Sequence, residues 1–177
     1  MKKQITQMEK ELFEAVEIRN VNKVKELLDK GVNVNARRKF GGTPLMAAVF
    51  GGFIPVDIYL VKLLLEYGAD VNAQNNLGTS VLMFAVYSEN VNVVKPLIDY
   101  NVDINAQDTN GDTALIYSAW LCRDSDVIKL LLQNGADVNI KNKEGKTAID
   151  IARERRYVGE IIRLLEIKQK EEKWIKI

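Results

Sequence analysis

The residue types that carry most enzyme chemistry are scarce in this chain. It has no histidine, the commonest general base and metal ligand, so its one cysteine, Cys122, lacks the partner of a Cys–His nucleophile. The glycine pairs at 41–42 and 51–52 have neither the spacing nor the lysine of a phosphate-binding loop. Asp124 and Asp126 are better explained as a helix cap and a first-turn charge than as a catalytic pair. We therefore expect no enzymatic activity, no cofactor and no bound metal.

Composition and charge narrow the classes of partner. The 177 residues are 47% hydrophobic and 28% charged, which is ordinary for a globular chain, and the net charge is +1. A general nucleic-acid binder should carry a clear basic excess, so we expect no nucleic-acid partner. No stretch approaches the roughly 18 apolar residues of a membrane span, so we expect no membrane insertion. A single cysteine and the absence of an apolar run after the basic start predict a cytoplasmic location.

The chain is organised by a repeated turn-and-helix motif. Gly41 begins the stretch Gly-Gly-Thr-Pro-Leu-Met-Ala-Ala, and reduced forms begin at Gly78, Gly111 and Gly145, at intervals of 37, 33 and 34 residues. A period of about 33 residues is typical of repeat arrays, in which each unit buries its apolar side against its neighbours. The long first interval comes from an insertion around Phe53-Ile54-Pro55, which is either a contact for a partner or a packed, elongated loop.

The motif Thr-Pro-Leu-x-x-Ala, followed further along by Gly-Ala-Asp-Val-Asn-Ala, resembles the ankyrin repeat. The resemblance covers residues 38–167 well and residues 8–37 in part. It implies an all-α solenoid of stacked helix-turn-helix units with β-turn or hairpin connections. We expect one array over residues 1–177, made of an N-terminal capping unit (8–37), full repeats (38–74, 75–107 and 108–141), a C-terminal capping repeat (142–167) and a charged tail (168–177) that either continues the last helix or frays.

Two positions of the motif are informative when the chain is compared with the ankyrin repeat, namely the residue after Thr-Pro-Leu and the asparagine near the end of each unit. Ankyrin repeats usually place a histidine after Thr-Pro-Leu, where it bonds the threonine hydroxyl, and three units here have an apolar residue there instead. In the fourth unit, Asp150 is still able to accept a hydrogen bond from Thr147. An asparagine also follows Val or Ile in the extended segment, or arm, that comes after the second helix of a unit. These arm asparagines either bond the neighbouring turn, which explains them fully, or are sites of the hydroxylation known for ankyrin proteins of animal cells. They are Asn35, Asn72, Asn105 and Asn139.

An aromatic residue recurs at one position of three successive units. Phe50, Tyr87 and Trp120 each lie seven residues after the threonine that begins the motif or its equivalent, and Glu154 takes this place in the last unit. Aromatic rings are common hot spots of protein interfaces. The alternative is that the rings fold back over the helix connections and complete the core. In ankyrin-like arrays this position faces outward, which favours contact with a partner.

The loop tips add further candidates, because the resemblance implies that tips and first helices make the concave binding face. The charges of the turns are patterned, and they are either a solvated surface or a charge code for a partner. The first turn is basic (Arg37, Arg38 and Lys39), the third acidic (Asp108 and Asp112) and the last basic again (Lys141, Lys143 and Lys146). The predicted partner-binding residues are Phe40, Phe50, Leu77, Tyr87, Asn110, Asp112, Trp120 and Lys143.

These observations predict a non-enzymatic module that binds an unidentified protein through its concave face, and we expect the chain to be a monomer. The alternative is a structural or targeting segment of a larger assembly that has no independent partner.

Overall fold

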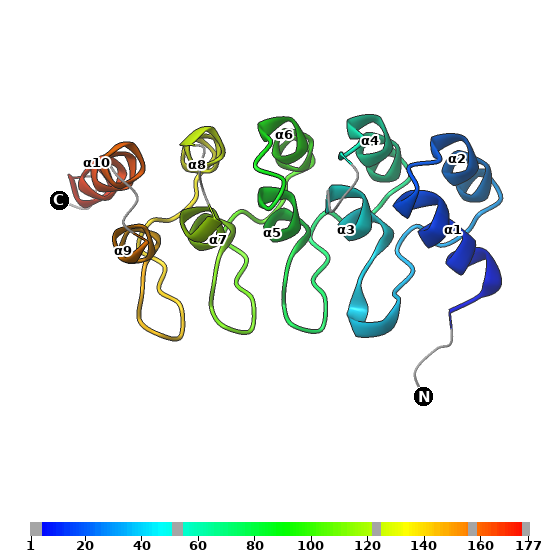
Figure 1. Ribbon diagram of the computed structural model, residues 1–177, viewed down its shortest axis with the longest axis horizontal. Coiled ribbons are helices and arrows are strands. Elements are labelled where there is room, and N and C mark those ends of the chain that lie inside the picture. The colour runs from blue at the N-terminus through cyan, green and yellow to red at the C-terminus, as the bar shows by residue number, and fades with distance from the viewer. Residues whose placement is uncertain (1–4, 51–54, 122–124, 156–158, 175–177) are drawn as a thin grey trace.

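The helices of this protein form antiparallel pairs that stack side by side in two layers, with loops projecting from one edge like fingers (Figure 1). The computed structural model describes residues 5–50, 55–121, 125–155 and 159–174. The predicted all-α solenoid is confirmed. Cys122, Asp124 and most of the insertion, residues 51–54, lie outside the described residues.

The two layers contain the first and the second helix of each pair. The inner layer is made of α1 (Gln7–Glu17), α3 (Pro44–Val49), α5 (Val81–Val86), α7 (Ala114–Leu121) and α9 (Ala148–Glu154). The outer layer is made of α2 (Val21–Asp29), α4 (Ile58–Glu66), α6 (Val91–Asp99), α8 (Ser125–Gln133) and α10 (Glu160–Trp174). A short 3-10 helix, η1 (Lys39–Gly41), lies in the loop before α3. Residues 168–174 continue α10, so this part of the charged tail does not fray from the helix.

Hydroxyl side chains begin the short inner helices, as the motif predicts. Ser80 Oγ accepts a hydrogen bond from the Met83 N–H, and the Met83 sulfur accepts one from the Ser80 N–H at 3.3 Å. In the last unit, the Asp150 carboxylate accepts from the N–H and the hydroxyl of Thr147 at 3.0 and 2.7 Å, which confirms the predicted link. Met83 therefore keeps a weak polar bond at a position where we expected apolar packing alone.

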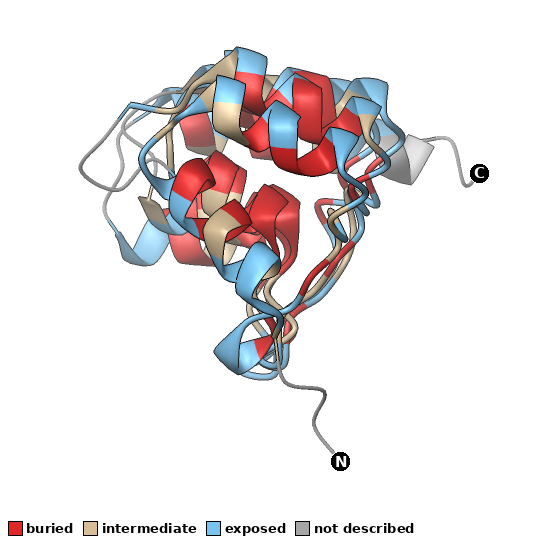
Figure 2. Cartoon of the chain, turned by 90° about the vertical axis from the view of Figure 1, so that its right-hand side faces the viewer, coloured by how far each residue is buried: buried red, intermediate tan, exposed pale blue. Residues whose placement is uncertain are grey.

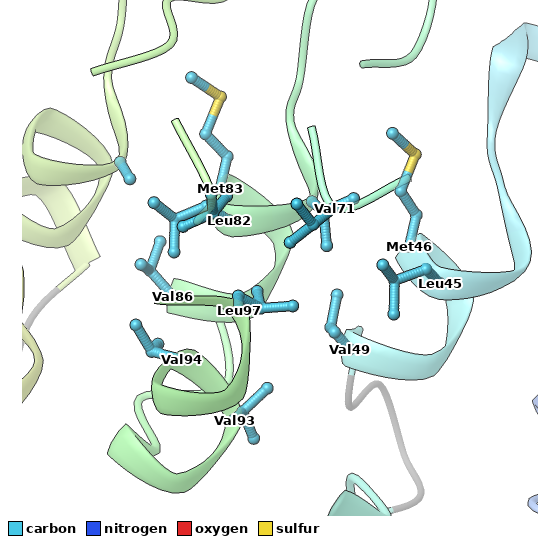
Figure 3. Packing of buried hydrophobic residues seen from close by; sticks show 14 of the residues in the cluster. Leu45, Met46, Val49, Val71, Leu82, Met83, Val86, Val93, Val94 and Leu97 are labelled. Carbon is cyan, nitrogen blue, oxygen red and sulfur yellow. The ribbon is translucent and has the colours of Figure 1, made fainter. Parts of the chain in front are cut away.

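The hydrophobic core is a continuous layer between neighbouring pairs. Figure 3 shows Leu45 and Val49 of α3, Leu82 of α5 and Leu97 of α6 converging there, all almost completely buried. Viewed from the end, the buried residues gather between the two helix layers, while the outer surfaces are exposed (Figure 2). Helices this short are marginal alone, so burial between neighbours, at about 25 cal/mol per Å², must supply most of the stability. Small, fully buried residues let the inner helices approach closely, namely Ala48, Ala85, Ala119 and Ala152.

Neighbouring loops are joined at their tips by backbone hydrogen bonds. Each tip carbonyl accepts from an N–H of the next loop, and each loop turns at a glycine with φ between 73° and 81°. This regular bonding sets the spacing of the units. The three tip bonds run from Asn76 N–H to Phe40 O (2.9 Å), from Thr109 N–H to Leu77 O (2.9 Å) and from Lys143 N–H to Asn110 O (2.8 Å).

The arm asparagines provide a second set of bonds between units. The Asn105 side chain donates to the Gly135 carbonyl at 3.0 Å and accepts from the Asp137 N–H at 2.9 Å. Asn35 makes the same two bonds two units earlier in the array, to Gly68 and Asp70. Bonding of the neighbouring turn, one of the two roles considered for these asparagines, is confirmed for Asn35, Asn72 and Asn105. The last of the four, Asn139, accepts a hydrogen bond from the Gln169 side chain.

The loop glycines offer a test of how closely neighbouring units approach. Gly78 and Gly145 have nearly the same φ, 73° and 77°, but a Cβ on Gly78 would lie 2.9 Å from the Asp108 Cα, whereas one on Gly145 meets nothing within 4 Å. We expect Gly145→Ala to lower the free energy of unfolding by about 1 kcal/mol, the cost of a left-handed alanine. Gly78→Ala should cost clearly more, because the next loop must also shift. Urea denaturation measures both, and equal losses would show that backbone conformation alone requires these glycines.

Candidate partner-binding surface

The three predicted rings lie at the C-terminal ends of consecutive inner helices. Phe50 and Tyr87 follow α3 and α5, and Trp120 occupies the last turn of α7. These residues are 48%, 42% and 47% exposed, respectively, so they are not members of the buried core. Each ring therefore presents about half of its surface to solvent.

Two further rings, which sequence reasoning missed, contact two of the predicted ones. Phe84 lies 5.9 Å from Phe50 in an edge-to-face contact, and Tyr117 lies 5.8 Å from Tyr87. Phe84 and Tyr117 come three residues before Tyr87 and Trp120, one turn earlier on the same helix face. That spacing was the signal that could have found them. Phe50, Phe84, Tyr87, Tyr117 and Trp120 together form what we call the aromatic row.

Arginines from flanking units hold both ends of the aromatic row. The Arg19 guanidinium donates to the carbonyls of Ala47 and Phe50, each at 3.1 Å. At the other end, Arg155 Nε donates to the Trp120 carbonyl at 3.2 Å, and its guanidinium carbon lies 4.4 Å from the Trp120 ring centroid. Neither arginine belongs to the repeated motif, so the sequence pattern did not point to them. Arg19 thus fixes the backbone at Phe50, and Arg155 fixes both the backbone and the ring of Trp120. Groups held in this way lose little freedom when a partner binds.

The predicted tip residues are exposed but differ in chemistry. Phe40 and Leu77 present large apolar side chains to solvent. Phe40 adopts a φ of +68°, which is uncommon for a residue other than glycine, and the Lys39 ammonium lies 4.9 Å from its ring centroid. Asn110 and Lys143 are exposed too, and the Lys143 N–H donates to the Asn110 carbonyl.

The basic first turn is mostly engaged within the protein. The Arg37 guanidinium donates to the carbonyls of Gly41 and Gln74, at 3.2 and 2.7 Å. Arg38 forms an ion pair with Glu17 and lies over the ring of Phe13. These two arginines therefore act in the scaffold, and the structure does not favour a charge code at this turn.

The acidic third turn lies beside the aromatic row. Asp108 accepts a hydrogen bond from the Tyr117 hydroxyl at 3.0 Å and from the N–H of Asp112 at 2.9 Å. The Asp112 carboxylate accepts from the side-chain amide of Asn142 at 2.8 Å. Partial removal from water raises the pKa of Asp112, and the nearby charge of Asp108 adds to this, against the opposing effect of the Asn142 hydrogen bond. Burial, followed by the hydrogen bond to Asp108, raises the pKa of Tyr117.

Some classes of site do not occur in the part of the chain that the structure describes. There, no group of three or more acidic or cysteine side chains is arranged to hold a metal ion. Within the same residues, every helix is too short or too polar to cross a membrane.

Stacked helix pairs and loops bonded to one another at their tips define a solenoid repeat protein. The chain belongs to the ankyrin repeat family, because a family model that represents three copies of the repeat matches residues 12–108, 57–142 and 82–173. The resemblance inferred from the motif is thereby confirmed. Ankyrin repeats are generally protein–protein interaction modules and are typically non-enzymatic. A search of curated proteins found no match.

The raised pKa of Asp112 predicts a pH-dependent contribution to stability. The folded protein holds this proton more tightly than the unfolded chain, so ionisation lowers the free energy of unfolding as the pH rises through the raised value. We expect the free energy of unfolding of Asp112→Asn at pH 7 to equal that of the wild type or to exceed it by up to about 1 kcal/mol. The gain is small because water screens this partly exposed group. The difference should shrink towards about pH 4. Urea denaturation at both pH values measures it, and a less stable variant at pH 7 would contradict the assignment.

Proposed function

We propose that this chain is a non-enzymatic binding module whose protein partner contacts the concave face made by the inner helices and the loops. The observation that carries the proposal is the aromatic row, whose three most exposed members are contributed by three successive units. A contiguous apolar patch on a protein surface calls for an explanation, and aromatic rings are the usual anchors of interfaces. Phe40 and Leu77 add two exposed apolar side chains at the tips of the loops.

The exposure of the rings and the anchoring of the backbone that carries them support this proposal over a merely structural role. The core of the array is complete without the exposed faces of Phe50, Tyr87 and Trp120, since the buried cluster consists of other residues. The flanking arginines fix the backbone at both ends of the row, at Phe50 and Trp120. A partner would therefore meet a surface that is already ordered, which reduces the entropy cost of binding.

A matched pair of double variants tests the proposal. Tyr87→Ala with Trp120→Ala removes two rings from the inner face, whereas Tyr59→Ala with Tyr100→Ala removes two exposed rings from the outer layer. We expect the first to reduce the amount of specifically captured protein at least tenfold, because a tenfold loss of affinity corresponds to about 1.4 kcal/mol and truncation of hot-spot rings costs at least that much. The second should capture as much as the wild type. Quantitative pull-down from a cell lysate, with urea denaturation of each variant, provides the measurement.

Three outcomes would contradict the proposal. Equal capture by the two double variants would place the contact elsewhere on the protein. Unfolding of the Tyr87 and Trp120 variant would show that the row is part of the core. If the wild type captures nothing specific, the alternative of a structural or targeting segment in a larger assembly is the better account.

A further inference from the structure

The aromatic row ends in a pocket of about 530 Å³. The pocket lies between the two loops that precede α7 and α9 and the inner helices α7 and α9 themselves. Three rings of the row line it, those of Tyr87, Tyr117 and Trp120. The loops contribute charged side chains, among them Asp112 and Lys146. The pocket therefore combines aromatic walls with ionic groups, and such a pocket discriminates between ligands by their charge and polarity as well as by their shape.

The two cations of the pocket lining already have partners within the protein. Lys146 forms ion pairs with Glu144 and Glu154, at 3.0 and 2.9 Å. Arg155 lies over the Trp120 ring and donates to the Trp120 carbonyl. A ligand that needed either cation would have to compete with these contacts.

Asp112 is in the opposite situation. Its carboxylate accepts a hydrogen bond from the neutral amide of Asn142, and among the residues that the structure describes it has no lysine or arginine in ion-pair contact. Asp108 and Glu144 lie close enough to add negative charge. Removing a carboxylate from water without a compensating cation is unfavourable for the folded protein. A cation supplied from outside would relieve this cost.

We propose that this pocket binds an arginine side chain of the protein partner, with the guanidinium paired to Asp112 and packed against the rings of Tyr87 and Tyr117, beside the Trp120 ring that Arg155 already covers. The inference rests on the proposed function and names the chemistry of its partner. The guanidinium is planar, so it stacks on aromatic faces and pairs with a carboxylate through two hydrogen bonds, and an ammonium does neither as well. The described lining has an excess of carboxylates over cations, and this excess favours a positively charged occupant over an acidic one.

The pocket can be tested without knowing the partner. N-acetyl-arginine methylamide, titrated into the ¹⁵N-labelled protein, should produce saturable shifts of the Trp120 indole N–H and the Asp112 backbone N–H, with the millimolar affinity expected of a single side chain. The citrulline analogue, which has the same shape without the charge, should bind at least tenfold more weakly. Asp112→Asn should lose at least tenfold in affinity for the arginine probe. Asp99→Asn, a matched change on the outer layer, should lose nothing.

Several results would overturn the inference. They are the absence of a saturable shift, equal binding of the arginine and citrulline probes, and unchanged affinity in Asp112→Asn. Tighter binding of N-acetyl-aspartate methylamide would assign the pocket to an acidic side chain at Arg155 instead. The effect of Asp112→Asn on partner capture separates the two proposals. If this variant captures as well as the wild type while the Tyr87 and Trp120 variant does not, the arginine pocket is wrong and the proposed function stands.

Discussion

The structure depends on one constraint, which is that no helix pair can bury its apolar side alone. Each pair must meet its neighbour at a fixed distance, and that distance is set by polar groups as much as by packing. The tip bonds, such as the one from Thr109 N–H to Leu77 O, and the bridging amides, such as Asn105, repeat the same separation from unit to unit. At Gly78 the next loop comes so near that a Cβ would touch its backbone. Small alanines then suffice to pack the inner helices.

The same regular spacing produces the candidate binding surface. Because every unit repeats one geometry, residues at one motif position line up along the array, and an aromatic choice in successive units becomes a continuous row. The inner helices are short, so Phe50 and Tyr87 fall just past the buried segment and keep about half of their surface exposed. The surface therefore forms because equivalent positions of successive units are aligned. Its aromatic character gives way to charge where the residues differ, as at Asp112 and Arg155.

The candidate site was only partly predictable, and the reason is visible in particular residues. Phe50, Tyr87 and Trp120 were found because they share a motif position. Phe84 and Tyr117 share another position, but Ala47 and Ile151 occupy it in the other two units, so no aromatic pattern marks that position along the chain. The basic first turn was considered as a surface for a partner, yet Arg37 and Arg38 bond to Gln74 and Glu17, which lie 37 and 21 residues away in the chain. Such pairings depend on how the units stack.

The sequence by itself determined the repeat, the family, the helix starts and the polar link from Thr147 to Asp150, because these follow from local signals spaced by helix and turn geometry. Only the tertiary structure decided which charges are engaged within the scaffold and which are left to face a pocket. In the sequence, Lys146 and Asp112 are both simply charged residues of loop turns. In the structure, Lys146 has two carboxylate partners, whereas Asp112 is bonded to a neutral amide. That difference arises from contacts between loops and helices of adjacent units, and the order of residues along the chain does not specify such contacts by periodicity alone.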